Sequence, residues 1–245
     1  MRDRIPTFPA PASPPPSTSG GHGWTLDAVA AGLAGALKKS GHTVAVSECT
    51  SGGLLAASLL SLPGASAYFT GGAVAYASGA REALVPGTHD ALRALERDRG
   101  SDNYASTTRY WESRVLWATT AARDLQLMCG ADWGIAEVGA AGPSFHPATG
   151  VDKSSSGSGF TVVAVVGPPL DAQTEADRVW VRVCETGHNR RDENMWQFAA
   201  AAASLAARCV EGSEPEDNAE TKDAAGDVRN DQWGEALHAA KRAWL

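Results

Sequence analysis

The chain has 245 residues, of which 43% are hydrophobic and 20% are charged, as is typical of a globular protein with one sizeable core. The formal net charge of -7 argues against a general affinity for nucleic acid or for anionic membrane surfaces. No apolar run is long enough to span a bilayer and no signal-peptide core is present, so we expect a soluble, cytoplasmic protein. The four cysteines form no CxxC pair, so we expect no metal site.

Composition divides the chain into three zones. Residues 1–23 are rich in Pro, Ser and Gly and are expected to be disordered, because they cannot bury enough apolar surface to offset their ordering entropy. Residues 24–211 carry the periodic apolar pattern of one domain. Residues 212–245 begin as an acidic linker and end in DQWGEALHAAKRAWL, which fits a short amphipathic helix. That helix either packs on its own domain or contacts a partner chain.

Helical and strand-like patterns alternate along the domain. The apolar spacing predicts helices at 26–37, 51–62, 79–85, 88–97, 107–128 and 191–210. It predicts strands at 42–48, 71–77, 133–139, 159–167 and 178–185. A short polar connection joins the last two strands and favours a hairpin. The predicted fold is therefore α/β, a three-layer α/β/α sandwich with a mixed, mostly parallel five-stranded sheet.

The segment ECTSGG (48–53) joins a strand end to an apolar helix through a cysteine, two hydroxyl residues and two glycines. Backbone N–H groups at a helix N-terminus attract anions, glycines let a ligand approach the backbone, and a thiol placed there tends to have a lowered pKa. Alternatively, a hydroxyl residue caps the helix, the glycines pack it on the sheet and the cysteine is a small buried hydrophobe. The candidate site residues in this segment are Glu48, Cys49, Thr50, Ser51, Gly52 and Gly53.

The segment GGAVAYASGAREAL (71–84) places Tyr76 at the end of a strand and Arg81 in the following helix. A tyrosine hydroxyl can hydrogen-bond a ligand, and a guanidinium can hold a phosphate or carboxylate in a fork. The structural alternative is a tyrosine at the rim of the core and a solvated arginine.

Two later segments also follow strands. GIAEVGAAGP (134–143) carries Gly139 and Gly142 and leads into a long polar loop, which is either close to a ligand or merely a connection. In CETGHNRRDENMWQFAAAA (184–202), Arg191 opens a helix and suits a phosphate, unless the turn only caps that helix.

These four segments, in this order, resemble the CinA C-terminal domain family, whose bacterial members include nicotinamide mononucleotide deamidases. The resemblance runs from about Leu26 to Val210. It implies a three-layer α/β/α domain with a mixed sheet, often a homodimer, and no metal or cofactor. It also implies amide hydrolysis, in which nicotinamide mononucleotide and water give nicotinate mononucleotide and ammonia.

The sequence departs from the active bacterial pattern, in which the turn reads E-S-C-T-G-G with a nucleophilic serine and a later lysine is the general base. Cys49 takes the serine position and Ser51 the threonine position. Tyr76 and Arg191 match the family residues, but Arg81 takes the lysine position. Arginine cannot be deprotonated in proteins, whereas cysteine is itself a competent nucleophile.

Three hypotheses follow. In the first, the chain is an amidohydrolase: Cys49 attacks the carboxamide, the N–H groups of residues 51–53 stabilise the oxyanion, and Arg81, Arg191 and Tyr76 hold phosphate and ribose. In the second, the chain is a catalytically inactive family member that binds a small-molecule, nucleotide-like ligand or serves as a scaffold, which the loss of the lysine favours. In the third, it is a structural interaction protein that uses its C-terminal helix.

Overall fold

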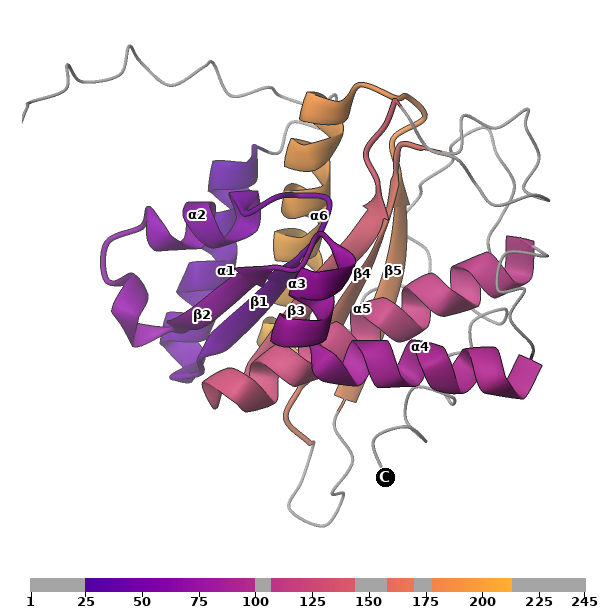
Figure 1. Cartoon of the computed structure of the whole chain (residues 1–245). Helices are drawn as coiled ribbons and strands as arrows, with labels where there is room; N and C mark the ends of the chain where they lie inside the picture. The colour runs from indigo at the N-terminus through magenta and orange to yellow at the C-terminus, as the bar shows by residue number, and fades with distance from the viewer. Residues whose placement is uncertain (1–24, 100–106, 144–157, 170–177, 213–245) are drawn as a thin grey trace, which may run out of the picture.

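A computed structural model describes residues 25–99, 107–143, 158–169 and 178–212 (Figure 1). The segments predicted to be disordered or to form a C-terminal helix lie outside these residues. The helices of the described part are α1 (Leu26–Ser40), α2 (Leu54–Leu60), α3 (Ser78–Leu84), α4 (Pro86–Arg99), α5 (Thr107–Cys129) and α6 (Arg191–Glu211). The strands are β1 (Val44–Glu48), β2 (Phe69–Val74), β3 (Trp133–Ala140), β4 (Phe160–Gly167) and β5 (Arg178–Glu185).

The five strands form one sheet in the order β2-β1-β3-β4-β5. β1 pairs in parallel with β2 and with β3, whereas the β3–β4 and β4–β5 pairs are antiparallel. The mixed sheet and the final hairpin are confirmed. The expectation of a mostly parallel sheet is wrong, because β3 and β4 are also direct antiparallel neighbours, and apolar patterning marks a strand without revealing its direction.

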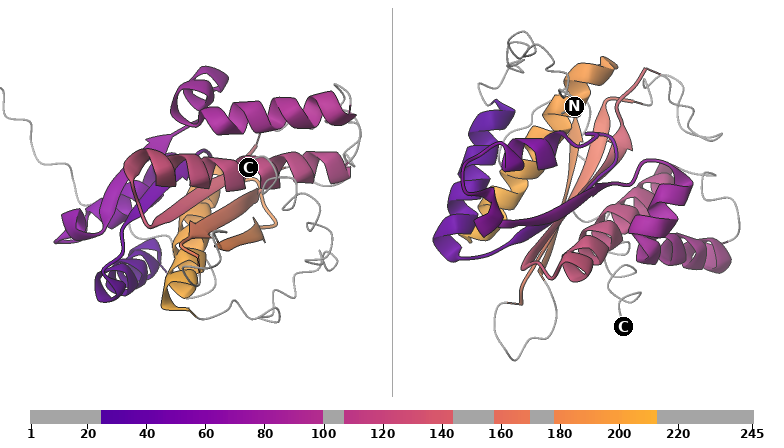
Figure 2. Two further views of the ribbon diagram at one scale, coloured as in Figure 1. Left: turned by 90° about the horizontal axis from the view of Figure 1, so that it is seen from below. Right: turned by 60° about the vertical axis from the view of Figure 1, so that its left-hand side comes forward.

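Helices cover both faces of the sheet, as predicted. α1, α2 and α6 pack on one face and α3, α4 and α5 lie on the other (Figures 1 and 2). Along β3 the side chains alternate between the two cores: Ile135 packs with Leu33 and Leu37 of α1, and Ala136 packs with Trp117 of α5. None of the described helices is both long and apolar enough to cross a membrane.

The start of α2 differs from the prediction. Helical structure begins at Leu54, not at residue 51, because Gly52 and Gly53 adopt φ values of +68° and +100°. These left-handed conformations favour glycine and interrupt a right-handed helix. Residues 49–53 are therefore a turn that leads into α2.

Candidate functional site

The carboxyl ends of β1, β2 and β3 lie at one edge of the sheet. β2 pairs with one side of β1 and β3 pairs with the other side, so the strand order reverses at β1 and creates a topological switch point there. Open α/β sheets bind ligands at such a switch point, outside the carboxyl ends of the strands. The turn 49–53 follows β1, Tyr76 and Arg81 follow β2, and Gly142 follows β3, so the predicted residues gather at this edge.

The Glu48 carboxylate caps the start of α2. It is 1% exposed and accepts hydrogen bonds from the backbone N–H groups of Gly53 (2.9 Å), Leu55 (3.1 Å) and Ala56 (2.8 Å). The N–H groups that the sequence suggested for an external anion are thus partly satisfied by an internal carboxylate.

A second buried carboxylate, which sequence reasoning missed, lies against the turn. Glu137 of β3 is 2% exposed, and its Oε1 accepts from Cys49 N and Ser51 N, both at 2.7 Å, and from Ser51 Oγ at 2.7 Å. Its Oε2 accepts from the hydroxyls of Thr50 and Thr161. The available signal was a charged residue in the middle of an otherwise apolar strand, where a carboxylate requires partners.

The two carboxyl groups meet at one hydroxyl. Ser51 Oγ lies 2.6 Å from Glu48 Oε2 and 2.7 Å from Glu137 Oε1. A hydroxyl has one hydrogen to donate, so Ser51 Oγ either shares it between the two carboxyl oxygens or donates it to one of them while a protonated carboxyl group donates to Ser51 Oγ. Burial, and in a smaller part the nearby Glu137 charge, raise the pKa of Glu48. The raised pKa favours the protonated form of Glu48.

The Cys49 thiol faces α5 rather than solvent. It is 8% exposed, and burial, reinforced by the Glu137 charge, raises its pKa to about 12. Arg114, Arg81 and Arg191 oppose this shift without cancelling it. The predicted lowering of the Cys49 pKa is therefore wrong, because the cost of burying a thiolate outweighs the attraction of three nearby cations.

Three guanidinium groups surround this edge. Arg81 of α3 and Arg114 of α5 both stack on the Trp117 ring, at 4.3 Å and 5.0 Å from its centroid. Arg191 Nη2 donates to the hydroxyl of Tyr76 at 3.3 Å. Within the described part of the chain none of the three arginines forms an ion pair. Sequence reasoning missed Arg114, because an arginine in a long helix is usually a solvated surface residue.

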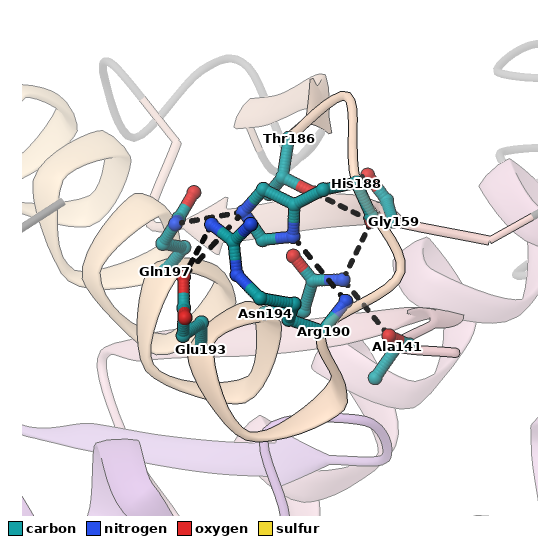
Figure 3. A network of polar contacts seen from close by, with 8 residues as sticks. All are labelled: Ala141, Gly159, Thr186, His188, Arg190, Glu193, Asn194 and Gln197. Atoms are coloured by element: carbon teal, nitrogen blue, oxygen red, sulfur yellow. Dashed lines mark hydrogen bonds and ion pairs between the residues drawn. The ribbon is translucent and has the colours of Figure 1, made fainter. Parts of the chain in front are cut away.

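Polar contacts fix the start of α6 (Figure 3). Asn194 is fully buried, and its Nδ2 donates to Ala141 O at 2.8 Å and to His188 O at 2.9 Å. Arg191 Nη1 donates to Gly142 O at 3.1 Å. These bonds tie α6 to the residues that follow β3 and thereby position Arg191.

The two glycines proposed after β3 have close backbone neighbours. A Cβ on Gly139 would lie 2.0 Å from Phe160 O, and one on Gly142, whose φ is +94°, would lie 2.7 Å from Asn189 O. Both positions therefore require glycine for backbone packing, whether or not a ligand is bound.

Part of the sequence is similar to a known protein family. The model of the CinA C-terminal domain matches residues 26–96. The resemblance to the CinA C-terminal domain family is confirmed. No curated protein matches the sequence.

Solved structures of CinA superfamily proteins share the fold of this CinA-like domain. A superfamily protein from Klebsiella pneumoniae is 16% identical with a TM-score of 0.57, covering 77% of this chain and 99% of that one. A competence or damage-inducible protein from Enterobacter asburiae is 16% identical with a TM-score of 0.56, covering 76% and 99%. A competence/damage-inducible protein from Agrobacterium tumefaciens is 18% identical with a TM-score of 0.55, covering 74% and 92%.

The family-model match covers only part of the site. It includes the turn 49–53, Tyr76 and Arg81, but it ends before Arg114, Glu137 and α6. Of the groups that surround the turn in this CinA-like domain, Arg114, Glu137 and Arg191 thus come from segments for which the solved structures show similarity of fold alone.

Proposed function

We propose that this CinA-like domain binds a phosphate-bearing, nucleotide-like ligand at the carboxyl edge of β1–β3 and does not hydrolyse it through Cys49. The observation that carries the proposal is the set of three guanidinium groups at this edge, none of which has a carboxylate partner among the described residues. Guanidinium groups that gather without forming ion pairs favour an anionic ligand.

The surroundings of these arginines suit a nucleotide monophosphate. The Trp117 ring holds Arg81 by cation–π stacking, which restricts the guanidinium plane and lowers the ordering cost of a bidentate phosphate contact. Arg191 is held by Gly142 O and by the hydroxyl of Tyr76. The Tyr76 side chain is 57% exposed, so its ring is available to a base or ribose.

Three features argue against hydrolysis through Cys49. Its pKa of about 12 leaves almost no thiolate at neutral pH. Arg81, at the position of the family base, cannot accept a proton. Ser51 N and Gly53 N, which would stabilise an oxyanion, already donate to buried carboxyl groups.

Ligand binding is tested by calorimetry with nicotinamide mononucleotide and with inorganic phosphate. We expect Arg81→Ala and Arg191→Ala each to weaken nucleotide binding by about 10-fold or more, because each removes charge-assisted hydrogen bonds. Arg93→Ala is the matched control, since Arg93 is an exposed arginine of α4 that bonds His89. Absence of binding to the wild-type protein, or equal losses in all three variants, would overturn the arginine site for this ligand.

Hydrolysis is tested separately by measuring ammonia release from nicotinamide mononucleotide. We expect none from the wild-type protein. Turnover that disappears in Cys49→Ala would refute the second half of the proposal and restore the amidohydrolase hypothesis.

A further inference from the structure

Five donors from two segments converge on the Glu137 carboxylate. We call this donor set the anion hole; it consists of Cys49 N, Ser51 N, Ser51 Oγ, Thr50 Oγ1 and Thr161 Oγ1. Both carboxylate oxygens are engaged, and the group is only 2% exposed. A buried carboxylate with this many donors is held as an anion would be held in a dedicated binding site.

The geometry around Glu137 Oε1 is that of an oxyanion site. Two backbone N–H groups and one hydroxyl lie 2.7 Å from this single oxygen. Donors that stabilise the oxyanion of a tetrahedral intermediate lie at about 2.7–3.1 Å from the oxygen. Cys49, at the position where the family places its nucleophile, provides one of these donors and Ser51 provides the other two, so this is the place where such an oxygen would develop.

We infer that Glu137 is the resident anion of the anion hole and that it excludes the oxyanion of an amide-hydrolysis intermediate from this chain. Glu137 thereby allows the carboxyl ends of β1–β3 to bind a ligand without hydrolysing it. This role rests on the proposed function. Without its carboxylate the hole is a binding site for a small planar monocarboxylate.

The inference is tested by chemical rescue of Glu137→Ala with formate. Truncation removes the carboxylate but keeps the donors, and we expect Tm to fall by roughly 10 °C because several buried donors lose their acceptor. Formate should then raise the Tm of Glu137→Ala saturably and by more than it raises the wild-type Tm. Sodium chloride at equal ionic strength should not reproduce this rise.

Two further variants control for cavity size and for non-specific effects. Glu137→Gln fills the same volume, so formate should not stabilise it beyond its effect on the wild type. Asp132→Ala removes a carboxylate that accepts from Thr43 N and Thr43 Oγ1 at the opposite end of β1, and formate should not rescue it beyond the wild-type effect.

Each outcome decides the inference. Equal formate shifts in Glu137→Ala, Glu137→Gln and the wild type would overturn it, as would equal effects of formate and chloride. If Glu137→Ala does not fold, the variant is refolded in formate or in chloride, and recovery in formate alone supports the inference whereas recovery in neither refutes it. Because nucleotide binding to the arginines is measured on the wild-type protein, its failure leaves this result unaffected.

Discussion

The reactivity of Cys49 distinguishes a nucleophile from a buried structural thiol. Burial raises its pKa to about 12 from an ordinary value of 9.0. At pH 8 the thiolate fraction then falls from roughly one in ten to roughly one in ten thousand. Since the thiolate is the reacting species, we expect alkylation of Cys49 to be about 1,000-fold slower than that of an unperturbed cysteine, before any further loss from its burial.

The assay is iodoacetamide alkylation of the native protein at pH 8, followed by peptide mass spectrometry. Cys129 and Cys184 are half-buried and should be modified first. Cys209 is a matched control, because it is buried and its pKa is also raised to about 12. Faster modification of Cys49 than of Cys129 and Cys184, with a rate that rises through a midpoint near pH 7, would refute this reasoning and show an activated thiolate.

Three further predictions concern stability. Because the folded-state pKa of Glu48 is raised, protonated Glu48 contributes its full stabilisation below pH 4.5, and this contribution is lost as pH rises through the folded pKa. Urea titrations from pH 4 to 8 should therefore show the wild type losing stability relative to Glu48→Gln, which mimics the protonated form. Parallel curves of stability against pH for the two proteins would contradict the raised pKa of Glu48. Gly142→Ala should lower the free energy of unfolding, measured in urea, by about 2 kcal/mol or more, against about 1 kcal/mol for Gly130→Ala. Both glycines have positive φ, but only Gly142 has a backbone atom within 3 Å of the new Cβ. Equal losses would refute the steric argument. Asn194→Asp should lower Tm more than Asn194→Ala at pH 7, because a buried carboxylate would face two carbonyl oxygens. The difference in Tm between the two variants should shrink at pH 4, where the carboxylate is more readily protonated. A difference that does not depend on pH would exclude this cause.

The elements of the fold were predictable because their apolar faces are periodic. Leu33 and Leu37 recur at a helical spacing, and β1 is buried at every position, so both patterns follow from burial alone. The direction of the strands could not be fully predicted from the sequence. The antiparallel pairing of β3 with β4 depends on the path of the chain between them, which the polar composition of residues 144–157 does not encode.

The location of the candidate site was predictable from the sequence, but only some of its residues were. A strand that ends in ECTSGG requires a turn at the sheet edge, and Tyr76 and Arg81 follow the neighbouring parallel strand, so they reach the same edge. Glu137 was not identified, because its partners Cys49 and Ser51 are 88 and 86 residues away in the sequence and no local pattern links them. The pKa of Cys49 was predicted to fall although it rises, because the burial that mainly raises it involves α5, which, like Glu137, is distant in the sequence.

The chemistry of the turn depends on what faces its donors. The same N–H groups and hydroxyls of residues 49–53 would stabilise a developing oxyanion if solvent or substrate faced them, but here Glu137 and Glu48 accept from them. A phosphate brought to this turn would meet an occupied donor set and the buried Glu137 charge. Arg81 and Arg191, which have no carboxylate partner in the described structure, offer the more favourable electrostatic environment. In the proposed function, the internal carboxylates therefore shift anion recognition from the backbone of the turn to the surrounding guanidinium groups.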